Sequence, residues 1–139
     1  MMTSAQPTAA SNIDHRPVIL VVEDEWLIRM STVDALREIG WRVVEAADGA
    51  EAVAFIQSGA TIDLIFTDVR MPGPIDGLDL LVFAQQALPG IPVVVSSGHL
   101  DPVTAVNAGA AAFLMKPYDL NQVATLIGAK LKRIPDDIG

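Results

Sequence analysis

Short apolar runs alternate along this chain with longer stretches in which apolar residues recur at helical spacing. Five runs rich in valine, isoleucine, leucine and phenylalanine predict buried strands. They cover residues 18–22, 41–46, 62–67, 92–96 and 112–115. Such short apolar runs are typical of a parallel sheet that helices cover on both faces.

The stretches between the runs predict five helices and carry signals for their ends. The predicted helices cover residues 26–39, 49–59, 78–88 and 102–108, with a final helix from residue 120 onward. Gly40 and Gly109 are the predicted stops of the first and fourth helices. Asp48–Glu51 and Asp119–Gln122 match capping boxes before the second and fifth helices. The final helix has apolar residues at helical spacing, which are Leu120, Val123, Ile127, Leu131 and Ile134.

Strands that alternate with helices predict an α/β fold, with a five-stranded parallel sheet and right-handed crossovers. The length of 139 residues fits one domain. We expect residues 1–16 to be a disordered arm, residues 17–134 to form the domain, and residues 135–139 to be a tail.

Composition and charge exclude several classes of protein. The net charge of −8 argues against nonspecific binding of DNA, which needs clustered lysine and arginine. No apolar run reaches the roughly 18 residues of a membrane span, so no membrane insertion is expected. The chain has no cysteine, which excludes disulfides and thiolate metal sites. The N-terminal residues lack the features of a secretory signal, so we expect a cytoplasmic protein.

Charged residues stand at the ends of three predicted strands. Glu23-Asp24 follows the first strand, Asp68 follows the third, and Lys116 follows the fifth. Charges beside buried strands need partners, and the carboxyl ends of parallel strands meet at one edge of the sheet. We therefore expect one shared site, where the carboxylates hold a hard divalent cation such as magnesium and the lysine neutralises an oxyanion.

The charged strand ends belong to a longer ordered series of residues. The series is Glu23-Asp24, Asp68 with Met71-Pro72 and Asp76-Gly77, Ser97, and Lys116-Pro117. In this order the chain resembles the receiver domain of two-component response regulators, from Pro17 to Arg133. The resemblance implies the doubly wound, flavodoxin-like fold of that family.

The resemblance also implies a phosphorylation site that depends on a metal ion. In the family, the aspartate that ends the third strand accepts the phosphoryl group, and here that residue is Asp68. Mg²⁺ would be held by the carboxylates of Glu23, Asp24 and Asp68. The backbone carbonyl of Arg70 would be a further ligand.

Further roles follow from the same resemblance. Ser97 and Lys116 would hold the phosphoryl oxygens. Ser97 and Phe113 would form the switch that reports phosphorylation. Arg70 and His99 occupy positions that tune how fast the phosphoryl group is lost in the family.

A protein of this kind is a signalling switch that catalyses its own phosphorylation and dephosphorylation. Its donor would be a sensor histidine kinase or a histidine phosphotransfer protein of a bacterial two-component system. We expect a stand-alone receiver that contacts a downstream protein target or acts as a phosphate sink. The oligomeric state stays open.

Simpler interpretations stay open for several of these residues. They are capping of the first helix by Asp24 or Glu25, a surface role for Lys116, Ser96 in place of Ser97, a core position for Phe113, and an exposed loop position for His99.

Three other functions share parts of the pattern. An aspartate-nucleophile phosphatase needs a second acid where Arg70 stands, and a flavin-binding module needs a phosphate-binding loop where Glu23-Asp24-Glu25 stands. A receiver that is never phosphorylated would not need Asp68 and Lys116 together.

The chain departs from the common family pattern in the length of two segments, and it has Ser97 and Gly98 where threonine and alanine are more frequent. The loop at residues 71–77 is one residue longer than the usual form. The segment from Ser97 to Gly109 is shorter by roughly one helical turn than in the chemotaxis regulator. Asp101-Pro102 also disfavours helix at its start, so we expect a fourth helix that is short or mobile.

Overall fold

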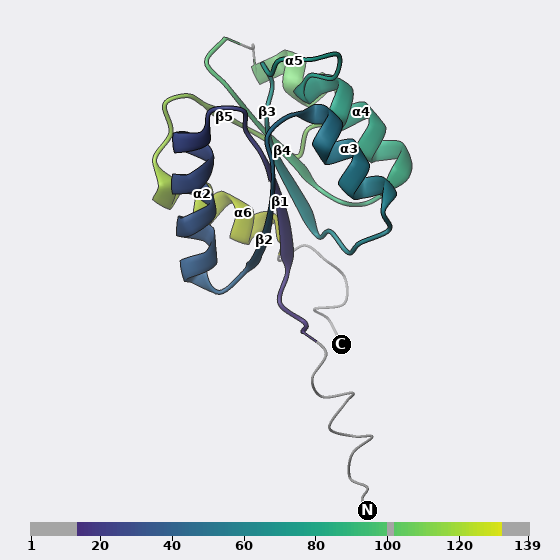
Figure 1. The fold of residues 1–139 in the computed structure, drawn as a ribbon. Coiled ribbons are helices and arrows are strands. Elements are labelled where there is room, and N and C mark those ends of the chain that lie inside the picture. Colours follow the sequence, from purple (N-terminus) through teal and green to yellow (C-terminus); the bar gives the residue numbers. More distant parts are fainter. Residues whose placement is uncertain (1–13, 100–101, 132–139) are drawn as a thin grey trace, which may run out of the picture.

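A parallel sheet of five strands organises the part of the chain that the structure describes, residues 14–99 and 102–131. In this computed structural model the strand order is β2-β1-β3-β4-β5 (Figure 1). The strands are β1 (Val18–Val22), β2 (Arg42–Ala46), β3 (Leu64–Asp68), β4 (Val93–Ser97) and β5 (Ala112–Met115). This is the doubly wound order of flavodoxin-like folds, so the predicted fold class is confirmed.

Helices cover both faces of the sheet. They are α2 (Trp26–Ile39), α3 (Gly49–Gln57), α4 (Gly77–Ala87), α5 (Pro102–Asn107) and α6 (Leu120–Leu131). Figure 1 shows α2 and α6 on one face, with α3, α4 and α5 on the other. The fourth helix is short, as expected, with six residues and one buried side chain, Ala105.

Successive residues of the central strands pack against opposite layers of helices. On β1, Ile19 and Val21 join the core under α2 and α6, whereas Leu20 and Val22 join the core under α3 and α4. All five residues of β1 are buried. This alternation explains why the strand reads as a continuous apolar run.

The strand ends differ from the sequence prediction by one or two residues. β3 begins at Leu64 and includes Asp68, and β4 begins at Val93 and includes Ser97. The predicted ends at residues 67 and 96 were therefore one residue early. Backbone pairing continues through these polar positions, since Asp68 pairs with Ser96 across the two strands. As a result, Asp68 and Ser97 are the last residues of their strands.

Helix ends follow local signals, with two corrections. Gly40 ends α2 in the left-handed region, with φ of 110°. Asp48 caps α3 through the N–H of Glu51, but the Glu51 carboxylate accepts from Ala47, so the predicted capping box is only half formed. The predicted capping box between Asp119 and Gln122 was wrong. Asp119 instead accepts from the N–H of Asn121 at 2.7 Å.

A capping box that was not predicted begins α4. Asp76 caps α4: its carboxylate accepts from the backbone N–H of Asp79, and the Asp79 carboxylate accepts from the backbone N–H of Asp76. This box stabilises the start of the helix that follows the Asp68 loop.

Some predictions fall on residues that the structure does not describe. These are most of the N-terminal arm, Ile134 of the final helix, the tail at 135–139, and Leu100 and Asp101 before α5. The domain boundaries therefore stay predictions. Among the described residues, no helix is long and apolar enough to cross a membrane.

Candidate functional site

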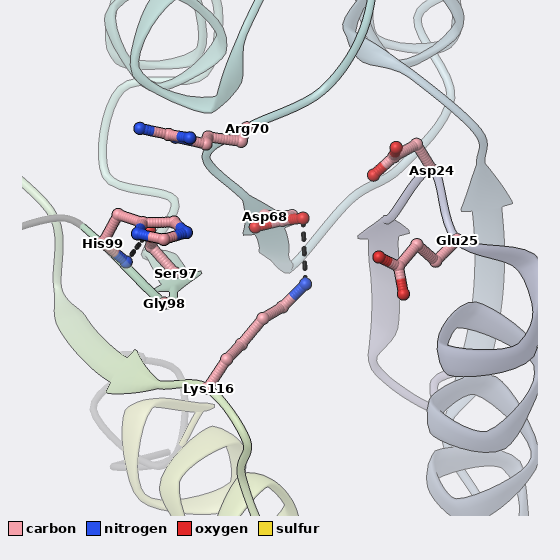
Figure 2. Close-up of a pocket in the computed structure, with 8 residues that line it drawn as sticks. All are labelled: Asp24, Glu25, Asp68, Arg70, Ser97, Gly98, His99 and Lys116. Atoms are coloured by element: carbon pink, nitrogen blue, oxygen red, sulfur yellow. Dashed lines mark hydrogen bonds and ion pairs between the residues drawn. The ribbon is translucent and has the colours of Figure 1, made fainter.

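Loops at the carboxyl ends of four strands surround a cavity of about 230 Å³. Its lining residues are Asp24, Glu25, Asp68, Arg70, Ser97, Gly98, His99 and Lys116. Figure 2 shows Asp68 near the centre, Asp24 and Glu25 on one side, and Arg70 and His99 on the other. The cavity therefore lies where the parallel strand ends were expected to bring charged residues together.

Lys116 links two buried carboxylates at the base of the site. Its Nζ donates to Asp68 Oδ2 and to Glu23 Oε1, each at 2.9 Å. One of the dashed lines in Figure 2 joins Lys116 to Asp68. Burial alone would lower the pKa of Lys116, but the bonds to Asp68 and Glu23 outweigh it and raise that pKa. The lysine therefore stays charged across the physiological range.

Glu23 lies beneath the cavity with 3% of its surface exposed. One carboxylate oxygen accepts from Lys116, and the other accepts from the backbone N–H of Glu25 at 3.2 Å. Burial, helped by the charge of Asp68, raises the pKa of Glu23 in spite of the bond from Lys116. The bond from Lys116 therefore does not fully offset the cost of burying the Glu23 carboxylate.

The acids of the site form a cluster suited to a divalent cation. Carboxylate oxygens of Glu23, Asp24 and Asp68 lie within 4.8 Å of one another. Three carboxylates and one ammonium leave a net charge of −2, which one divalent cation would neutralise. Hard cations such as Mg²⁺ prefer oxygen ligands of this kind, so the donor set fits the predicted metal.

Asp24 is the member of the acidic pair that faces the cavity, whereas Glu23 has both oxygens engaged by protein donors. Glu25 holds the N-cap position of α2 but makes no side-chain capping bond. Glu25 also lines the cavity, a role that sequence reasoning missed. The run of three acids was the signal that could have indicated it.

Asp68 is held by its own strand and by the helix that follows. Its Oδ1 accepts from the N–H of Val69 at 2.8 Å. Gly77, the first residue of α4, packs against the backbone of Asp68 and Val69, and its N–H donates to the Val69 carbonyl at 2.8 Å. A side chain at Gly77 would overlap the Asp68 carbonyl oxygen, so glycine permits this approach.

The structure distinguishes between the two adjacent serines. Ser97 lines the cavity, and its Oγ accepts from the N–H of His99 at 3.0 Å. Ser96 is 1% exposed and does not line the cavity. Arg70 and His99 are exposed at the rim. The metal-binding role of the Arg70 carbonyl stays a prediction.

Phe113 lies outside the site. It is half-buried on β5, packs against the core under α3 and α4, and lines a separate hollow along α6. The switching role of Phe113 therefore rests on its strand position alone and stays a prediction.

Comparison with known proteins indicates one family. The family model of the response regulator receiver domain matches residues 19–128. The chain is 36% identical over 135 residues to the transcriptional regulatory protein PdtaR of Mycobacterium tuberculosis, covering 95% of this chain and 64% of that protein. It is also 36% identical over 128 residues to the sensor kinase CckA of Brucella abortus, covering 89% of this chain and 13% of that protein. The chain thus spans less than two thirds of either relative.

Solved structures agree with these matches. A CheY-like receiver domain protein from Methanospirillum hungatei superposes with a TM-score of 0.81 at 30% identity, covering 88% of this chain and 98% of that one. The receiver domain of the hybrid histidine kinase CckA gives a TM-score of 0.70 at 40% identity, covering 82% of this chain and 98% of that one.

Proposed function

Because this chain belongs to the response regulator receiver family, we propose that its site accepts a phosphoryl group on Asp68. The donor is a phosphohistidine of a sensor histidine kinase or a histidine phosphotransfer protein. The observation that carries this proposal is the position of Asp68, 2.9 Å from Lys116 and within 4.8 Å of two further acids in an open cavity.

The transfer exchanges one bond for another. A carboxylate oxygen of Asp68 attacks the phosphorus atom, the phosphorus–nitrogen bond breaks, and the released imidazole takes up a proton. Asp24, Asp68 and Glu23 would hold Mg²⁺, which would supply charge neutralisation for the phosphoryl oxygens. Such a reaction needs mainly positioning and charge, which this site offers.

Lys116 and Ser97 complete the proposed phosphoryl site. Lys116 already contacts Asp68, so its ammonium lies close to where the phosphoryl oxygens would be. Ser97 offers a hydroxyl donor from the end of the neighbouring strand. Arg70 and His99 lie across the cavity from Asp24 (Figure 2), a position that supports the proposal that they influence the access of water and thus the loss of the phosphoryl group.

The phosphorylated form would signal to a downstream protein or act as a phosphate sink. We propose a cytoplasmic location in a bacterial two-component system, in keeping with bacterial relatives such as PdtaR. The aspartate-nucleophile phosphatase is less suited, because Arg70 lines the cavity where that chemistry needs a second acid.

Intact-mass measurement with acetyl phosphate and Mg²⁺ tests the proposal. The unmodified chain should gain one phosphoryl group, and Asp68→Asn should gain none. Asp48→Asn is the matched control, because asparagine caps a helix as well as aspartate does and Asp48 lies outside the cavity. Equal phosphorylation of Asp68→Asn and the unmodified chain would contradict the assignment.

A further inference from the structure

Arg29, in the first turn of α2, joins three segments around the acidic loop. Its Nη1 donates to the backbone carbonyl of Glu23 at 2.8 Å, and its Nε donates to Glu45 Oε1 at 3.0 Å. Its own backbone N–H donates to the Glu25 carbonyl at 2.9 Å. The Arg29 side chain is 19% exposed, so most of its surface is buried against the protein.

The orientation of the Glu23 carbonyl affects the position of the Asp24 backbone. The peptide group that contains this carbonyl is planar and leads straight into the Asp24 backbone. On the other side, the N–H of Glu23 donates to the Ala46 carbonyl at 3.1 Å, which extends the β1–β2 ladder by one residue. Holding the carbonyl therefore sets the direction in which the chain leaves β1 and in which Asp24 projects.

We propose that Arg29 is a positioning residue for the cation site. The guanidinium anchors the Glu23–Asp24 peptide so that the Asp24 carboxylate lies beside that of Asp68. This inference rests on the proposed Mg²⁺ site. The planar guanidinium of arginine donates to the Glu23 carbonyl and to the Glu45 carboxylate from two different nitrogen atoms. The single ammonium group of a lysine does not reproduce this pair of hydrogen bonds.

Charge and positioning predict opposite effects of removing Arg29. By Coulomb attraction alone, loss of a cation near three carboxylates should tighten the binding of Mg²⁺. Loss of the anchored peptide should instead weaken it, because Asp24 would no longer be held beside Asp68. The sign of the change in affinity therefore separates the two explanations.

The experiment measures Mg²⁺ affinity by calorimetric titration of the full chain. We expect Arg29→Met to bind about tenfold more weakly, as for other groups that orient metal ligands. Glu45→Gln is the matched control, because its amide oxygen still accepts from Arg29 while the charge is lost, so its affinity should stay close to that of the unmodified chain. Arg29→Lys keeps the positive charge but lacks the planar guanidinium, so this variant should also bind Mg²⁺ more weakly.

Thermal unfolding in EDTA separates positioning from general stability. A merely structural role would lower the midpoint without changing Mg²⁺ affinity. Unchanged or tighter binding by Arg29→Met overturns the inference, and if that variant does not fold, Arg29→Lys decides by the same criterion. If Asp24→Asn binds as tightly as the unmodified chain, or the unmodified chain does not bind, the proposed Mg²⁺ site fails and this inference with it.

Discussion

Replacing Lys116 by methionine would remove the cation that joins the buried carboxylates of the site. The Asp68 and Glu23 side chains are only 8% and 4% exposed, and each accepts from Lys116 Nζ at 2.9 Å. Methionine has an apolar, flexible chain that can replace the packing of the lysine stem. The substitution therefore tests the charge more than the packing.

The expected cost in stability follows from burial. Removing one partner of a buried ion pair typically costs about 3–5 kcal/mol, because the remaining charge has no compensation. Lys116 is itself 20% exposed, so the lower end applies. We expect Lys116→Met to lower the free energy of unfolding by about 3 kcal/mol at mildly alkaline pH without Mg²⁺.

The loss should depend on pH. Burial and the charge of Asp68 already raise the pKa of Glu23 above 4.5, and removing Lys116 should raise it further. The folded variant then holds a proton on Glu23 that the unfolded chain has already released. Its stability should therefore fall as pH rises from 4.5 through the raised pKa, and the deficit should shrink as pH falls.

Urea denaturation in EDTA and in Mg²⁺ measures both effects. A cation at about a hundred times its Kd adds roughly 2.7 kcal/mol to a folded state that binds it. The more negative site of Lys116→Met should gain more than the unmodified chain does. Lys130→Met on α6 is the control, since Lys130 forms no ion pair with any described residue. If Lys116→Met matches this control in EDTA at alkaline pH, the reasoning is refuted.

Two further predictions concern the segments next to the site. Gly77→Ala should lower the free energy of unfolding by roughly 1–3 kcal/mol and slow phosphorylation by acetyl phosphate, because the new Cβ would push the backbone of Asp68 and Val69 aside. Urea denaturation measures the stability and intact mass measures the phosphorylation. Values equal to those of the unmodified chain in both assays would count against this prediction. The six residues of α5 bury only Ala105, so their amide hydrogens should exchange quickly in the unmodified protein. The exchange should become slower when a stable phosphoryl mimic is bound. Slow exchange that the mimic leaves unchanged would contradict the expectation.

The fold class and the meeting of charged residues at one edge of the sheet are predictable from the sequence alone. A short apolar run such as Val18–Val22 is typical of a strand in a sheet covered on both faces. Gly40 favours the end of a helix because glycine readily adopts the left-handed conformation of a C-terminal cap. Charges at three strand ends need partners, and parallel strands bring those ends to one edge. These are local or topological constraints, and they act wherever the pattern occurs.

The hydrogen-bond partners of the side chains depend on three-dimensional packing and cannot be predicted from the sequence. Glu23 and Lys116 are 93 positions apart, and their bond depends on the exact ends of two strands. A shift of one residue in a strand turns a side chain to the opposite face, so counting along the sequence favours Ser97 but leaves Ser96 open. The folded strand shows that Ser97 is the serine that lines the cavity. The bond from Arg29 to the Glu23 carbonyl depends on how α2 packs beside β2, and no sequence motif encodes a contact between a side chain and a backbone carbonyl at a strand end.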